Sequence, residues 1–143
     1  MILTDKEILS SKPLIKPFKI EQLTPNGYDV SSNKYILIPS HGNRVIVSNE
    51  TIKLPNNMSA QVWIKQKFAR QGIILSGSMI DAGFNGTLAL SLFNSGVGTV
   101  VIKKDETVAQ VVFIKLDREV EKAYKDRSGH YQNQKEDLIK WVM

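Results

Sequence analysis

Short segments of alternating apolar and polar residues, separated by turn residues, constrain the fold of this chain most strongly. An apolar residue recurs at every second position in "SAQVWIKQ" (residues 59–66) and in "TLALSLFN" (residues 87–94). Apolar runs also occur at residues 34–39, 43–49 and 107–116, as "KYILIP", "NRVIVSN" and "TVAQVVFIKL". Period-2 alternation is typical of β-strands that bury one face.

Turn residues punctuate these segments at close spacing. They are Asn26-Gly27, Pro39, Gly42-Asn43, Pro55-Asn56-Asn57, Gly72, Gly77, Gly83, Gly86, Gly96 and Gly98. Many short strands joined by such turns predict an all-β fold, either a barrel or a jelly roll. With 143 residues, the whole chain is expected to form a single domain.

The N-terminal segment is predicted to be helical. Thr4 and Glu7 form the T-x-x-E pattern of a capping box, in which each side chain satisfies a backbone donor of the other residue. This helix is expected to be short, because Ser10-Ser11-Lys12-Pro13 follows and the residue before a proline disfavours helix.

The C-terminal segment has a different composition from the predicted strands. After residue 117 the chain is polar and charged, so we assign residues 1–117 to the β core and residues 118–143 to a tail. Polar termini are often loosely held. This one carries Tyr124, Tyr131 and Trp141, which favours the alternative of a lid over a ligand or a neighbouring subunit.

Several chemistries are disfavoured by what the chain lacks. It has no cysteine, which removes disulfides, thiol catalysis and thiolate zinc sites. Its two histidines, His41 and His130, are far apart in sequence and argue against a zinc site. No stretch approaches the roughly 18 apolar residues that span a membrane, and the N-terminus shows no signal peptide. We therefore expect a cytoplasmic protein with no membrane segment and no metal ligands of its own.

The net charge of +5 is mild, and the basic residues are scattered. Small groups occur at Lys65, Lys67 and Arg70 and at Lys103-Lys104. Direct nucleic-acid binding usually shows a basic stripe with stacking aromatics, so none is expected. The excess fits a small polyanion such as a nucleotide, or simply a solvated surface.

Asp81 stands alone in the stretch "SMIDAGFNGTLALSLFN", residues 78–94. It is the only acid between Glu50 and Asp105, and it lies on a turn between two apolar strands. Gly83 and Gly86 allow positive φ or a close approach of the backbone to a ligand. Asp81 is therefore either an ordinary turn residue or a general base held at the edge of a pocket.

Six stretches of the chain resemble motifs of one known superfamily and follow one another in the same order. They are "MILTDKEI", "NGYDV", "IKLPNNMSAQVWIKQKFARQG", "MIDAGFNGTLAL", "VAQVVF" and "GHYQNQK". With them the chain resembles the dUTP nucleotidohydrolases and dCTP deaminases, and within these the archaeal-type dUTPase branch. The resemblance implies a distorted jelly-roll subunit and a homotrimer with active sites between subunits. It also implies a deoxynucleoside triphosphate as ligand, with Mg²⁺ on its phosphates.

The resemblance also assigns roles to residues. It implies that the turn after Ile80 reads a pyrimidine through backbone groups, that Phe84 packs on the deoxyribose, and that Asp81 orients the attacking water. A triphosphate needs cations and fixed donors, for which the lysines and Arg70 are the nearest supply. The expected nucleotide contacts are Lys65, Gln66, Lys67, Arg70, Ile80, Gly83, Phe84, Gln110, Tyr131 and Gln134. Gln110 is either a phosphate contact or a solvent-facing amide on an edge strand.

Three departures from the family pattern leave the activity open. Lys65-Gln66-Lys67 replaces the "RSS" of the family, so its serine is missing. Ser91 stands where the deaminase-like branch carries a glutamate, which argues against deamination. The tail ends in "KEDLIKWVM" rather than a "GVTLP"-like segment. Because Asp81, Gly83, Phe84, Arg70 and Gln110 are retained, the chain is expected to be a dUTPase that forms dUMP and pyrophosphate. The alternative is a degenerate nucleotide-binding or regulatory relative, and a dCTP deaminase is third.

Overall fold

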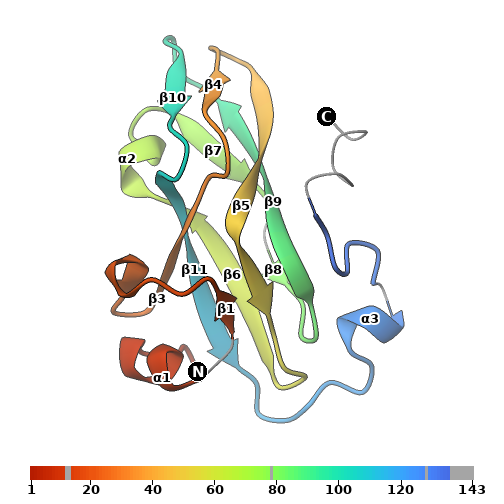
Figure 1. The fold of residues 1–143 in the computed structure, drawn as a ribbon. Helices are drawn as coiled ribbons and strands as arrows, with labels where there is room; N and C mark the ends of the chain where they lie inside the picture. Colours follow the sequence, from red (N-terminus) through yellow and green to blue (C-terminus); the bar gives the residue numbers. More distant parts are fainter. Residues whose placement is uncertain (12–13, 78, 128, 136–143) are drawn as a thin grey trace.

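Two antiparallel β-sheets dominate the computed structural model, which describes residues 1–11, 14–77, 79–127 and 129–135 (Figure 1). The five-stranded sheet has the order β2-β3-β11-β6-β8, with strands Leu23–Thr24, Gly27–Ser31, Thr107–Lys115, Met58–Ile64 and Met79–Ile80. The four-stranded sheet has the order β1-β5-β9-β7, with strands Ile15–Lys16, Asn43–Lys53, Asn85–Asn94 and Ile73–Ser76. β4 (Ile36–Ile38) pairs with β10 (Val100–Ile102). The all-β prediction is confirmed.

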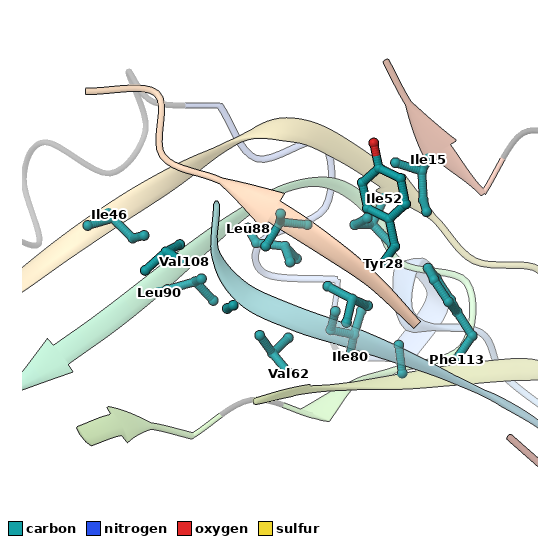
Figure 2. Close-up of a cluster of buried hydrophobic side chains, with 14 of the residues drawn as sticks. Ile15, Tyr28, Ile46, Ile52, Val62, Ile80, Leu88, Leu90, Val108 and Phe113 are labelled. Carbon is teal, nitrogen blue, oxygen red and sulfur yellow. The ribbon is translucent and has the colours of Figure 1, made fainter. Parts of the chain in front are cut away.

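The hydrophobic core lies between the two main sheets (Figure 2). β9 shows the predicted alternation, with every second side chain buried, because its inner face packs on the opposite sheet. β5 and β9 pair from Asn43↔Phe93 to Lys53↔Asn85, with a register irregularity between Val47 and Thr51. This long pairing holds β9 in place, and the turn that precedes β9 connects it to β8 of the five-stranded sheet.

Helices are short and sit at the edges of the sheets. α1 (Asp5–Ser10) has the predicted capping box at Thr4 and Glu7. A 3-10 turn, η1 (Ile20–Gln22), leads into β2. Two further helices were not predicted, α2 (Gln66–Ala69) and α3 (Tyr124–Arg127). α2 is anchored by Phe68, which is fully buried. No helix among the described residues is both long and apolar enough to cross a membrane.

The described part of the C-terminal segment is docked rather than loose. After β11 the chain runs past the turn between β8 and β9 (Figure 1). The Tyr124 N–H donates to the Ala82 carbonyl at 2.9 Å, and the Asn133 N–H donates to the Asn85 carbonyl at 2.7 Å. Trp141, predicted as one of the aromatic residues of the tail, lies outside the described residues.

Candidate active site

A cavity of about 570 Å³ opens beside β9 where β7 ends and the tail begins. Its described lining comes from β7, from β8, β9 and the turn between them, from the tail, and from Val45 of β5 and Val62 of β6. Most of this lining is apolar; the polar or aromatic members include Ser76, Asp81, Ser91, His130, Tyr131 and Gln134. The volume lies within the range of small-molecule sites.

Asp81 is the only carboxylate in the described lining of this cavity. It follows β8 directly, is exposed, and its backbone carbonyl accepts from the Phe84 N–H at 3.1 Å, which closes the turn. Among the described residues, no hydrogen bond or ion pair engages its carboxylate. The group is therefore held in position by the turn and available to a ligand or water.

The two glycines of the turn accommodate the tail. Gly83 has φ +87°, as its type allows, and an added Cβ there would lie 2.7 Å from Ala123 Cβ. A Cβ on Gly86 would lie 2.9 Å from the backbone N of Gln134. At both glycines the backbone thus approaches the chain's own C-terminal segment closely, and an approach to a ligand stays a prediction.

Phe84 is also covered by the tail. Its side chain is only 6% exposed, and its ring meets Tyr124 edge-on with centroids 5.4 Å apart. Both rings line the cavity. The aromatic position predicted to pack on a deoxyribose is thus fixed by tertiary contacts, with its remaining surface toward the cavity.

Gln134 and Thr87 fasten the tail to β9. The Thr87 N–H and hydroxyl both donate to the Gln134 carbonyl, at 3.1 and 2.8 Å. The Gln134 Nε2 donates in return to the Thr87 carbonyl at 3.0 Å. Tyr131 is held through its N–H, which donates to the Tyr124 hydroxyl at 2.8 Å, while its side chain is half exposed. Both predicted tail residues, Tyr131 and Gln134, therefore line the cavity with Asp81.

Ser91 faces the same cavity, ten residues after Asp81. It pairs across the strands with Ser76, another lining residue. The Ser91 hydroxyl donates to the Asn43 Oδ1 at 3.2 Å. The end of the cavity where the deaminase-like branch has an acid therefore carries neutral hydroxyl groups.

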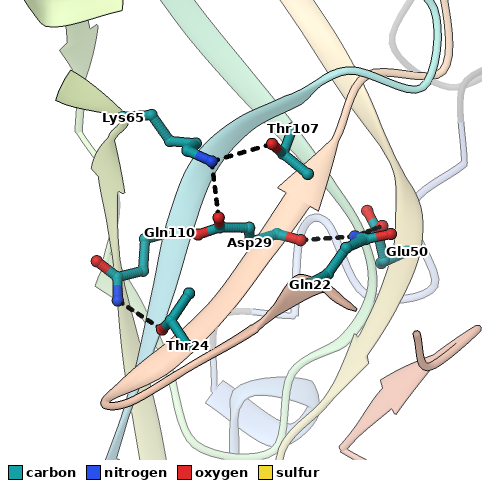
Figure 3. Close-up of polar contacts among 7 residues, drawn as sticks. All are labelled: Gln22, Thr24, Asp29, Glu50, Lys65, Thr107 and Gln110. Carbon is teal, nitrogen blue, oxygen red and sulfur yellow. Dashed lines mark hydrogen bonds and ion pairs between the residues drawn. The ribbon is translucent and has the colours of Figure 1, made fainter. Parts of the chain in front are cut away.

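The second group of predicted residues lies near the centre of the five-stranded sheet and at its α2 end. Figure 3 shows two of its members, Lys65 and Gln110. Lys65 Nζ donates to the Asp29 Oδ2 at 2.8 Å and to the Thr107 Oγ1 at 3.0 Å. Gln110 is on the central strand β11, and its Nε2 donates to the Thr24 Oγ1 at 2.8 Å. The alternative of a solvent-facing edge amide is therefore wrong.

Asp29 is a polar site residue that the sequence reasoning missed. It faces Gln110 directly in the β3–β11 register, and its side chain is 15% exposed. A carboxylate in the middle of an otherwise buried strand needs a partner, and Lys65 supplies it. The signal was present in "NGYDV", where a lone acid sits between Tyr28 and Val30.

Lys67, Gln66 and Arg70 lie on or beside α2. Lys67 forms an ion pair with Glu106. Burial alone raises the pKa of Glu106, but the Lys103 N–H and the Lys67 ammonium together hold it below its ordinary value. Gln66 and Arg70 are exposed, and no hydrogen bond or ion pair to another described residue engages the guanidinium of Arg70. Arg70 is thus the uncommitted cation of this group.

These two groups do not meet within one chain. None of Lys65, Gln66, Lys67, Arg70 and Gln110 lines the cavity that contains Asp81. Between the two groups lies a groove of about 460 Å³ along β6 and β7. Its rim carries three exposed apolar side chains, Trp63, Ile74 and Met79, which are 58%, 52% and 57% exposed.

Comparisons with known proteins bear on the family and the fold of the chain. A family model described as dUTPase matches residues 17–136. The chain is 32% identical to the dCTP deaminase of Thermococcus gammatolerans, over 92% of this chain and 91% of that protein. It is 29% identical to the probable deoxyuridine 5'-triphosphate nucleotidohydrolase of Sulfolobus islandicus rod-shaped virus 1, over 94% and 95%. The native dUTPase of EIAV superposes with a TM-score of 0.62 at 23% identity, covering 81% of this chain and 93% of that one. This last similarity shows the fold.

Proposed function

Since the chain belongs to the dUTPase family, as its sequence motifs predicted, we propose that it hydrolyses dUTP to dUMP and pyrophosphate. The observation that carries this proposal is the free carboxylate of Asp81, the only acid in the described lining of a nucleoside-sized cavity. Asp81 would accept a proton from a water molecule, whose oxygen attacks the α-phosphorus while pyrophosphate leaves.

Backbone groups of β9 support recognition of a pyrimidine. Thr87 directs its N–H and its carbonyl toward the tail, whereas the Leu88 N–H donates to Ser48 on the β5 side. Because backbone groups alternate sides along a strand, the N–H and carbonyl of Ala89 point the same way as those of Thr87. Ala89 lines the cavity between Gln134 and Ser76. A paired donor and acceptor there suits the edge of uracil.

The triphosphate requires cations that the cavity lacks. Its described lining contains no lysine or arginine, whereas Lys65, Lys67 and Arg70 gather on another face. We propose that a second copy of the chain supplies them, so that a homotrimer shares each site between neighbours. The exposed apolar groove at Trp63, Ile74 and Met79 lies between the two halves and is a suitable contact surface.

Magnesium would enter with the nucleotide. Among the described residues no group of three or more His, Asp or Glu gathers as a metal site. Phosphate oxygens are ligands that Mg²⁺ prefers, so the nucleotide itself suits the ion better than any cluster of these side chains. Once bound, the ion would neutralise phosphate charge, while Arg70 and Lys65 orient the chain of phosphates.

The tail is proposed to act as the lid of the site. Tyr124, His130, Tyr131 and Gln134 line the cavity, and hydrogen bonds to Thr87 hold the segment over it. A lid of this kind excludes bulk water from the reacting phosphate.

Two other functions have specific support. A nucleotide-binding or regulatory role without turnover is favoured by Lys65 and Lys67, whose ammonium groups are already paired with Asp29 and Glu106. Deamination of dCTP is favoured by the name of the Thermococcus relative. Against deamination, the described lining of this cavity holds no acid besides Asp81. Ser91 provides only a hydroxyl, which does not shuttle protons readily near neutral pH.

The test is a product assay. Purified protein is incubated with Mg²⁺ and either dUTP or dCTP, and the nucleotides are separated by anion-exchange chromatography. We expect dUMP from dUTP and an unchanged cytosine ring in the dCTP sample. Formation of dUTP or dUMP from dCTP would favour the deaminase. Unchanged nucleotide in both samples would favour the binding protein, and calorimetric titration with the same ligands would then measure its affinity.

A further inference from the structure

Glu50 is a buried carboxylate for which the proposed chemistry has no use. It lies on β5, is 2% exposed, and forms no ion pair with a described Lys, Arg or His. Its oxygens accept three hydrogen bonds, from the Ser31 N–H at 2.9 Å, the Ser31 hydroxyl at 2.8 Å and the Gln22 Nε2 at 2.8 Å. A buried charge is costly even when it is hydrogen-bonded, so an apolar residue would serve the core as well.

The register irregularity of β5 accounts for the placement of Glu50. It falls between Val47 and Thr51, opposite β9, and irregularities of this kind re-aim side chains. Glu50 is turned toward β3 of the other sheet, where Ser31 lies. The side chain thus ties the two sheets together at the strand that carries Asp29.

A chain of polar contacts leads from Glu50 to Lys65 (Figure 3). The Nε2 of Gln22 donates both to Glu50 and, at 2.7 Å, to the backbone carbonyl of Asp29. The carboxylate of Asp29 then accepts from Lys65 Nζ at 2.8 Å. Thr107 provides the other contact of the ammonium at 3.0 Å. Each link is buried or half-buried, so each fixes the next.

From this geometry we infer that Glu50 is a positioning residue for the phosphate-binding cation Lys65. Glu50 holds Gln22, Gln22 holds the backbone of Asp29, and Asp29 directs the ammonium of Lys65. Glu50 does not touch the nucleotide. The inference rests on the proposed function, since it gives Lys65 a phosphate to bind.

The test is a double-mutant cycle read by calorimetric binding. The probes are the non-hydrolysable analogue α,β-imido-dUTP with Mg²⁺, and deoxyuridine, which has no phosphate. We expect Glu50→Gln to weaken binding of the analogue about three- to tenfold. Deoxyuridine binding should change less than about twofold, because Lys65 does not act on the nucleoside. In a Lys65→Met background, Glu50→Gln should add less than about a twofold loss.

Controls separate positioning from a general structural role. Glu21→Gln is the matched variant, an exposed carboxylate beside Gln22, and it should leave binding of both probes unchanged. If Glu50→Gln fails to fold, Gln22→Met is measured in its place. It breaks the link between Glu50 and Asp29 while Glu50 keeps both hydrogen bonds from Ser31. An equal loss for both probes, or an equal loss with and without Lys65, would overturn the inference, as would unchanged binding. Wild-type protein that binds neither probe would instead overturn the proposed function.

Discussion

The carboxamide of Gln132 donates a hydrogen bond of 3.1 Å to the backbone carbonyl of Gly83, 49 residues earlier in the chain. Its Oε1 accepts from the Asn85 N–H at 2.9 Å. One side chain of the tail therefore satisfies backbone groups on both sides of Phe84. This contact joins the lid to the turn that carries Asp81.

Gln132→Ala is expected to loosen the tail, because two hydrogen bonds to the turn are lost. Asn85 and Thr87 both donate backbone hydrogens to the tail. Hydrogen exchange at these two amides should accelerate about tenfold, as expected for two bonds of modest net worth. Lys135→Ala, an exposed change in the same segment, is the control. Unchanged exchange at Thr87 would show that other contacts alone hold the tail.

Asp81→Asn is expected to lower the turnover of dUTP by at least about a hundredfold, because an amide cannot accept the proton of the attacking water. Binding of α,β-imido-dUTP should persist, since the shape of the turn depends on the backbone carbonyl of residue 81. Chromatographic product analysis and calorimetry measure the two effects. Asp117→Asn, an exposed acid outside the cavity lining, should turn over dUTP normally. Retained turnover in Asp81→Asn would exclude this residue as the base.

Mixed oligomers test whether neighbouring copies share a site. One variant carries Asp81→Asn, and the other carries Lys65→Met with Arg70→Met, so each alone should be inactive. Co-refolding them in equal amounts should restore about a quarter of the native sites. A working site needs Asp81 from one variant and the two cations from the other, and random mixing brings the two intact halves together at about one site in four. Turnover after co-refolding and light scattering provide the measurements. Activity that stays absent in mixed oligomers, or a monomeric protein, would contradict the shared site.

Glu106 should contribute stability that depends on pH. The Lys103 N–H and the Lys67 ammonium outweigh burial and lower its pKa in the folded protein. A carboxyl group whose pKa is lower in the folded than in the unfolded chain stabilises the fold at pH values above its unfolded pKa, which is near 4.5 here. That stabilisation disappears as the pH falls through the pKa of the group in the folded protein. Urea unfolding should therefore show wild type more stable than Glu106→Gln at pH 7, with the difference closing in acid. A constant difference would mean that Glu106 acts through packing instead.

Ser91→Glu places a second carboxylate in the cavity. We expect it to weaken binding of α,β-imido-dUTP about tenfold, because a second carboxylate in the cavity that holds Asp81 repels an anionic ligand. Ser91→Gln, of the same size but neutral, should bind the analogue more tightly than Ser91→Glu. Calorimetry at low ionic strength measures both, and added salt should reduce the difference where the charges are solvated. Equal affinities would show that size rather than charge matters at this position.

The strands were predictable because their alternation has a simple physical cause. Residues 87–94 put Leu88, Leu90 and Leu92 inward because one face of the sheet meets the core. The capping box of Thr4 and Glu7 was likewise predictable, since all of its contacts are local.

Contacts distant in sequence were not predictable in the same way. Pattern alone does not show that Lys65 would pair with Asp29, or that Gln132 would reach Gly83. α2 is a single turn, so its local sequence carries little helical signal. It is stabilised by the burial of Phe68, which the local sequence does not reveal. The tail was polar by composition, and its order comes from hydrogen bonds to the edge of β9. The roles of the nucleotide-contacting residues remain predictions.

The turn glycines change how substitutions near Asp81 should be read. A methyl group on Gly83 would meet Ala123 at 2.7 Å, and one on Gly86 would meet the backbone of Gln134 at 2.9 Å. In both places the displaced neighbour is the C-terminal segment. A loss of activity after Gly86→Ala would thus report first on a dislodged tail, whereas Gly83→Ala would also strain the turn itself, because residue 83 has φ +87°. The turn and the tail pack directly against each other, so a substitution in one of them is expected to displace the other.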